Sequence, residues 1–127
     1  MNVNLVLLKK DGSTEDFALP SGVTVIGRGE DSNLCIPLMI VSRKHCQINI
    51  EQNKLSIRNL GSSNGTIVNG KRIEESVINS GDLIQIGPVS FAVQVDGVPT
   101  KDSAIFAPTK RISNSDDVSE LNAVVNG

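Results

Sequence analysis

The chain has 127 residues, 39% of them hydrophobic, and a formal net charge of −2 at pH 7. This length suits one domain with a hydrophobic core and is too short for two domains of ordinary size. The near balance of 12 Lys and Arg against 14 Asp and Glu gives no electrostatic footprint for nucleic acid. We therefore expect no nucleic-acid partner, and any anion site must be local.

The hydrophobic residues favour strands. The chain has no Trp or Tyr and only three Phe, so its core must be built from Val, Ile and Leu, and the β-branched ones favour strands. No apolar run approaches the roughly 18 residues that a membrane-spanning helix needs, and the N-terminus lacks the pattern of a signal peptide. We expect a cytoplasmic protein without a membrane partner.

Residues 1–95 divide into short β-like runs separated by turn signals. The alternation in HCQINI, at 45–50, predicts that the even-numbered residues face the core and the odd-numbered ones, His45 included, face outward. In VSFAVQV, at 89–95, the odd-numbered residues are predicted to face the core, whereas Ser90 and Gln94 face outward. Both segments are predicted to be half-buried strands.

Turns and the lack of helices complete the pattern of an all-β fold. Asn69-Gly70, between TIV and KRI, predicts a type I′ hairpin because both central residues must tolerate positive φ. Residues 83–86 predict a further strand before the turn at Gly87-Pro88. No amphipathic helical window of useful length precedes residue 95, which excludes a parallel α/β architecture. A sandwich or a barrel remains.

From residue 96 onward the composition becomes polar. We therefore predict one β domain over 1–95 and a mostly irregular tail or linker over 96–127. Within the tail, DDVSELNAVV, at 116–125, has the pattern of a short C-terminal helix capped by Asp116 or Asp117.

The cysteines and the histidine do not form a metal site. Cys35 and Cys46 are not a CxxC pair, and His45 is the only histidine. Both cysteines are predicted to be free and mostly buried, and neither a metal nor a cofactor is expected. A hydrolase built on Ser42 and His45 would also need an orienting carboxylate, an oxyanion hole and a nucleophile elbow such as GxSxG, which is absent. No residue is assigned a catalytic role, and the chain is not predicted to be an enzyme.

Three segments contain residues suited to an anion: GRGEDSN at 27–33, VSRKH at 41–45 and NLGSSNG at 59–65. Each alone is equally well explained as an exposed turn. Their order and spacing, however, resemble the forkhead-associated (FHA) domain over roughly residues 3–95. The matching positions are Gly27-Arg28, Ser42 to His45, Asn59, Gly61, Ser63 to Thr66, Asn69-Gly70 and GDLIQIG at 81–87.

The resemblance implies a sandwich of two antiparallel sheets whose loops at one end bind phosphothreonine in a partner protein. Such a module recruits partners phosphorylated by Ser/Thr kinases. A phosphate dianion requires a guanidinium, hydroxyl donors and backbone N–H groups. The residues matched to phosphate binding are Arg28, Ser42, Arg43 and Ser63.

Three further residues are assigned by the same resemblance. Asn64 corresponds to the asparagine that bonds the peptide backbone beside the phosphothreonine. Gly27 allows close approach of the chain before Arg28, and His45 braces the binding loops. Lys44 and the pair Lys71-Arg72 are interpreted as solvated surface cations.

Selectivity in FHA domains often concerns the third ligand residue after the phosphothreonine, and the matching protein position here is Ile40. Because Ile40 is uncharged, we expect an apolar ligand residue at +3. In the tail, Thr109 is followed three residues later by Ile112, so self-binding of a phosphorylated Thr109 is a further hypothesis.

A phosphate-independent scaffold or oligomerisation domain with the same sandwich is the alternative. Arg28, Ser42 and Asn64 occur together, which favours phosphothreonine binding because a scaffold has no need of all three.

Overall fold

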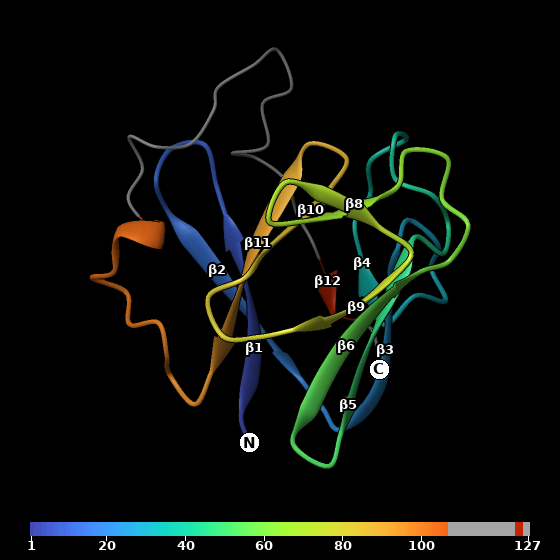
Figure 1. Cartoon of the computed structure of the whole chain (residues 1–127). Coiled ribbons are helices and arrows are strands. Elements are labelled where there is room, and N and C mark those ends of the chain that lie inside the picture. Colours follow the sequence, from blue (N-terminus) through green and yellow to red (C-terminus); the bar gives the residue numbers. More distant parts are fainter. Residues whose placement is uncertain (107–123, 126–127) are drawn as a thin grey trace.

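Two six-stranded β-sheets pack face to face in the computed structural model of the chain (Figure 1). The structure describes residues 1–106 and 124–125. The first sheet, sheet A, has the strand order β2-β1-β11-β10-β7-β8. Its strands are β1 (Val3–Leu8), β2 (Thr14–Leu19), β7 (Thr66–Val68), β8 (Lys71–Ile73), β10 (Leu83–Ile86) and β11 (Val89–Val95).

The second sheet, sheet B, has the order β12-β4-β3-β5-β6-β9. Its strands are β3 (Gly22–Gly27), β4 (Leu34–Cys35), β5 (Cys46–Glu51), β6 (Lys54–Asn59), β9 (Glu75–Ile78) and β12 (Val124–Val125). The predicted all-β sandwich is thus confirmed, with one correction. Sheet B is mixed rather than antiparallel, because β3 and β4 pair in parallel.

Aliphatic side chains from the facing sides of the sheets form the core. Alternation along β5 is as predicted, since Cys46, Ile48 and Ile50 are buried. The hairpin between β7 and β8 is also as predicted, because Asn69 and Gly70 both have positive φ, at 51° and 81°. Within the described residues no helix is long and apolar enough to cross a membrane.

Gln94 faces away from the main core, as predicted, but it is not exposed to solvent. Its side chain is 6% exposed and bonds on both ends: Oε1 accepts from Asn4 Nδ2 at 3.0 Å, and Nε2 donates to the Pro99 carbonyl at 3.1 Å. Gln94 lies on the outer face of sheet A, and the chain after β11 covers that face. A single strand pattern cannot reveal that a later segment returns over it.

Residues 98–106, hereafter the strap, make up this covering segment and end in a 3₁₀ helix, η1 (Ala104–Phe106). Phe106 is 5% exposed and packs against a second cluster formed by Val6, Leu8 and Ala92. Lys101 Nζ bonds Asp16 Oδ1 at 2.8 Å, tying the strap to β2. The part of the predicted tail that the structure describes up to Phe106 is therefore packed on the sandwich.

The prediction of a C-terminal helix over 116–125 is wrong for its last two residues. Val124–Val125 form β12, which pairs with β4. The rest of that segment, and the candidate self-binding residue Thr109, lie outside the described residues.

Candidate functional site

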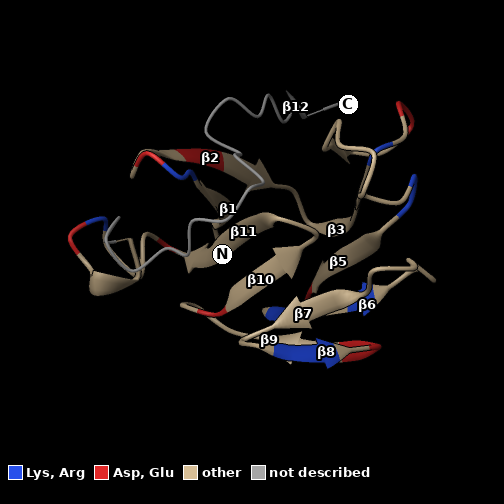
Figure 2. Ribbon diagram, turned by 90° about the horizontal axis from the view of Figure 1, so that it is seen from above, with Lys and Arg blue, Asp and Glu red and all other residues tan. Residues whose placement is uncertain are grey.

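The three anion-suited segments meet at one end of the sandwich because of strand register. Ile26 near the end of β3 pairs with Cys46 at the start of β5, and Cys46 pairs with Asn59 at the end of β6. The loops that follow β3, precede β5 and follow β6 must therefore lie side by side. Figure 2 shows the first two of these loops projecting together, one with an acidic tip and one with a basic tip.

Arg28 is held by the loop that precedes β5. Its backbone N–H donates to the Ser42 carbonyl at 2.9 Å, and its Nε donates to the Val41 carbonyl at 3.1 Å. The Nε bond orients the guanidinium while the terminal N–H donors remain for a ligand. This is the arrangement that a bidentate contact to phosphate needs.

Gly27 allows this close approach. A Cβ at position 27 would lie 2.0 Å from the Arg43 carbonyl oxygen and 2.7 Å from its carbonyl carbon. Backbone atoms cannot move aside as a flexible side chain can, so any larger residue would push apart the two segments that carry the arginines.

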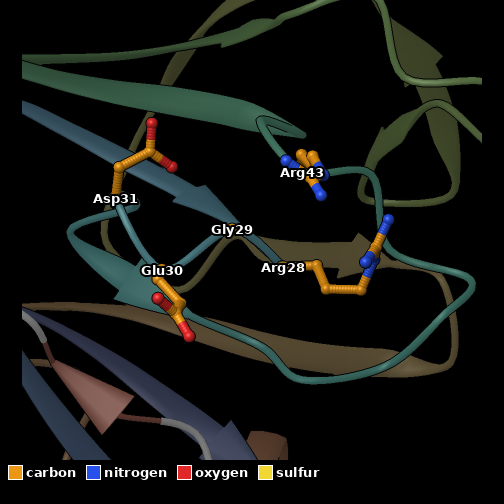
Figure 3. A pocket seen from close by; sticks show the side chains of 5 residues that line it. All are labelled: Arg28, Gly29, Glu30, Asp31 and Arg43. Atoms are coloured by element: carbon orange, nitrogen blue, oxygen red, sulfur yellow. The ribbon is translucent and has the colours of Figure 1, made fainter.

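Arg28 and Arg43 line the same pocket, which has a volume of about 500 Å³ (Figure 3). Arg43 is exposed and Arg28 is half-buried, so both cations are accessible. The same pocket is also lined by Gly29 and by the carboxylates of Glu30 and Asp31. Both acids belong to the GRGEDSN segment, but the sequence pattern alone assigned them no role.

His45 links two loops from inside the protein. Its side chain is fully buried, so the prediction that it faces outward with Gln47 is wrong. β5 begins only at Cys46, and strand alternation does not apply to the residue before it. The polar side chain at this position instead forms hydrogen bonds with backbone groups of the loops.

The hydrogen bonds of His45 define its tautomer. Nδ1 accepts the Ser42 N–H at 3.2 Å, so Nε2 carries the proton and donates to the Gly65 carbonyl at 2.7 Å. Burial lowers the pKa of His45, opposed by the bond to Gly65. The neutral imidazole thus links the Ser42 loop to the loop before β7 through these two hydrogen bonds.

Asn59 and Asn64 support the third loop. Asn59 Oδ1 accepts from Ser62 Oγ at 2.5 Å and from Thr66 Oγ1 at 2.9 Å. Asn64 Nδ2 donates to the Ile40 carbonyl at 2.7 Å, which places Asn64 next to the predicted specificity residue. The sequence pattern did not assign a role to Ser62 or Thr66. The signal that could have indicated these hydrogen bonds is the position of the two hydroxyl residues three and seven residues after Asn59.

The remaining predicted residues are not among those that line this pocket. Ser63 and Asn64 are exposed, and Ser42 is half-buried. Ile40 is 47% exposed and its neighbour Met39 is 84% exposed. An apolar surface therefore lies beside Asn64.

The cysteines and acids of the described residues do not suggest catalysis by a thiol or a metal. Cys35 and Cys46 are free as predicted, Cys46 buried and Cys35 half-buried. Burial raises the pKa of Cys46 to about 12, so its thiol is protonated and a poor nucleophile at neutral pH. Among residues 1–106 and 124–125, no group of three or more His, Cys, Asp or Glu is arranged to hold a metal ion.

Comparisons with known proteins agree on one family. The family model described as the FHA domain matches residues 24–87. The glycogen accumulation regulator GarA of Mycobacterium tuberculosis is 34% identical over 83 residues, which are 65% of this chain and 51% of GarA. FhaA of the same organism, an FHA domain-containing protein, is 33% identical over 92 residues, which are 72% of this chain and 18% of FhaA.

Solved structures give the same result. One, from a study of phosphothreonine-dependent FHA domain interactions, has a TM-score of 0.69 and 34% identity, and the match covers 75% of this chain and 97% of that one. The FhaA FHA domain complexed with the intracellular domain of Rv3910 has a TM-score of 0.66 and 35% identity, with 72% and 99% covered. The chain spans about half the length of GarA, one of the curated relatives it matches.

Proposed function

Because the chain belongs to the FHA domain family, we propose that it binds phosphothreonine in partner proteins and so recruits the products of Ser/Thr kinases. The observation that carries the proposal is the position of Arg28. Its guanidinium is fixed through Nε to the Val41 carbonyl and lines an open pocket together with Arg43. Two cations in one accessible pocket suit a phosphate dianion.

The proposed contacts divide among the three loops. Arg28 and Arg43 supply charge, and the hydroxyls of Ser42 and Ser63 bond phosphate oxygens. Asn64 bonds the ligand backbone and sets its register. Gly27 and His45 act indirectly, by holding the loops in place.

Ile40 is proposed to contact the ligand residue at +3. Its exposed side chain, next to Met39 and Asn64, offers apolar surface and no charge, so apolar ligand residues are favoured. Recognition of this kind requires no bond to be made or broken, and we propose a binding module rather than an enzyme.

Replacement of Arg28 by Ala tests the proposal directly. A charge-assisted hydrogen bond is worth about 1.5–3 kcal/mol, so affinity for a phosphothreonine peptide should fall about 10- to 100-fold. Stability should fall by only about 0.5–1.5 kcal/mol, the typical value of the one hydrogen bond lost between Arg28 Nε and the Val41 carbonyl. Binding of a degenerate phosphothreonine peptide library is measured beside its unphosphorylated and phosphoserine counterparts, with denaturant unfolding of each variant.

Arg58→Ala is the matched control. Arg58 is an exposed arginine on β6 that does not line the pocket, so its loss should leave binding intact. Binding that did not depend on the phosphate, or that survived Arg28→Ala, would refute the proposal. It would favour the phosphate-independent scaffold.

A further inference from the structure

The proposed phosphate site uses only half of its pocket. Figure 3 shows Arg28 and Arg43 toward one side, Glu30 and Asp31 toward the other, and Gly29 between them. A site that bound phosphate alone would gain nothing from two carboxylates in the same cavity, because they repel the dianion. A ligand that also carries positive charge would offset this repulsion.

The loop that carries the carboxylates is fixed against Arg43. The Gly29 N–H donates to the Arg43 carbonyl at 3.0 Å, and Ser32 Oγ donates to the same oxygen at 3.0 Å. Ser32 is fully buried, and its N–H bonds the Gly29 carbonyl at 3.0 Å. Residues 30 and 31 are therefore held between two anchored positions, next to the phosphate-binding arginines.

Successive contacts along residues 40–44 give the direction of the site. The partners follow in order, beginning at Ile40 and ending at Lys44: Asn64 with Ile40, Arg28 with Val41 and Ser42, Gly29 with Arg43, and Asp31 with Lys44. The carboxylates thus lie at the end of the segment opposite to Ile40, with Arg28 in between. A ligand whose +3 residue reaches Ile40 must direct its N-terminal residues toward Glu30 and Asp31.

Chain geometry limits which ligand residues reach the acids. Residues 30 and 31 follow Arg28 by two and three positions, and an extended chain advances at most about 3.3–3.6 Å per residue. An extended ligand with its phosphate at Arg28 therefore passes the carboxylates within its first three residues before the phosphothreonine.

We propose that Glu30 and Asp31 select ligands with Lys or Arg one to three residues before the phosphothreonine. The inference rests on the proposed phosphothreonine binding and adds a substrate class to it: a basic, phosphorylated segment with an apolar residue at +3. Asp31 has a cationic neighbour, since Lys44 Nζ lies 3.7 Å from its Oδ2. Both side chains are more than half exposed, and such pairs are weak, so a ligand cation can replace Lys44.

The test compares peptides that share a phosphothreonine and an Ile at +3 and differ by Lys, Ala or Glu at −1, −2 or −3. Dissociation constants are measured for the full chain and for the double variant Glu30→Gln, Asp31→Asn. The ratio between Glu and Lys peptides cancels the general effect of the acids on the phosphate. We expect wild type to prefer Lys by about three- to tenfold at the best position, and the double variant to lose most of this preference.

A second double variant, Glu51→Gln with Glu75→Gln, is the matched control because it changes net charge equally and neither residue lines the pocket. It should keep the Lys preference. The preference should also shrink as salt is raised, since exposed charges are screened beyond about 10 Å at 0.1 M ionic strength.

The outcomes separate this inference from the proposed function. Equal affinity for Lys and Glu peptides at all three positions, or a Lys preference unchanged by Glu30→Gln with Asp31→Asn, would overturn the inference alone. Failure of every peptide to bind in a phosphate-dependent way would overturn the proposed function as well.

Discussion

At the scale of single residues, a buried histidine and a half-buried asparagine hold the loops at one end of the sandwich together. His45 and Asn59 each bond two groups from different parts of the loops. A buried polar group stabilises only when its hydrogen bonds are made. The residues proposed to contact the ligand are therefore carried by loops that these polar side chains hold in place.

Thr24 and Thr66 differ in whether their buried hydroxyl groups are hydrogen-bonded. Both are buried, but Thr66 Oγ1 donates to Asn59, whereas Thr24 Oγ1 has no partner among the described residues. An unsatisfied buried hydroxyl costs about 1–3 kcal/mol, so Thr24→Val should raise the free energy of unfolding by roughly 1 kcal/mol. Thr66→Val should lower it by a similar amount. Urea unfolding of both variants checks the pair, and destabilisation by Thr24→Val would show that the hydroxyl is satisfied.

At the scale of elements, the strap covers the outer face of sheet A at β1 and β11, so both faces of the sheet are buried there. Val6, Leu8 and Ala92 point away from the main core, yet they are buried beneath Phe106 and Ile105. Lys101 also lies 5.6 Å from the centroid of the Phe106 ring. The strap therefore belongs to the folded unit, although its polar composition is typical of a linker.

Replacement of Phe106 by Ala measures how much the strap contributes. Loss of a buried phenyl ring typically costs about 3–5 kcal/mol, and because Phe106 lies at the edge of the fold we expect roughly 3 kcal/mol lower stability. Phosphopeptide affinity under native conditions should be retained, since the strap is not among the residues that line the pocket. Val98→Ala, at a 56% exposed position of the same segment, is the control. Equal, small effects of the two substitutions in denaturant unfolding would contradict the packing role of Phe106.

At the scale of the whole molecule, the stability should depend on pH through the one histidine in the chain. The folded-state pKa of His45 lies below its ordinary value of 6.5 because burial disfavours the charged ring. The unfolded state therefore binds more protons between the two pKa values, so stability increases as pH rises through that window and decreases as pH falls through it. The contribution of the neutral His45 is fully present above about pH 6.5 and is lost as pH falls through the lower, folded-state pKa.

The comparison with His45→Gln isolates this effect. Protonated Nδ1 would face the Ser42 N–H donor, so acid removes a bond that wild type has at neutral pH. The stability advantage of wild type over His45→Gln should shrink progressively below about pH 6.5, and phosphopeptide affinity should weaken in parallel. Unfolding curves at several pH values provide the measurement, and a constant difference between the two proteins would exclude the role assigned to His45.

Local patterns in the sequence determined much of this protein. Period-two alternation predicted β5, the positive-φ requirement predicted the turn at Asn69-Gly70, and the order of Gly27-Arg28, Ser42 to His45 and Asn64 predicted the FHA family. These signals depend on a residue and its near neighbours, so a linear chain records them. Glu30 and Asp31 can be read in the sequence, but the sequence does not show that they line a pocket with Arg28 and Arg43.

Only the tertiary structure decided which surfaces are covered and which loops meet. Gln94 and Phe106 are buried because a later segment returns over sheet A, and His45 is buried because the loop before β7 closes on it. The addition of β12 to β4 likewise joins segments far apart in the chain. Burial and hydrogen bonding between distant segments depend on the folded arrangement as a whole, whereas alternation and turn formation are properties of the local chain.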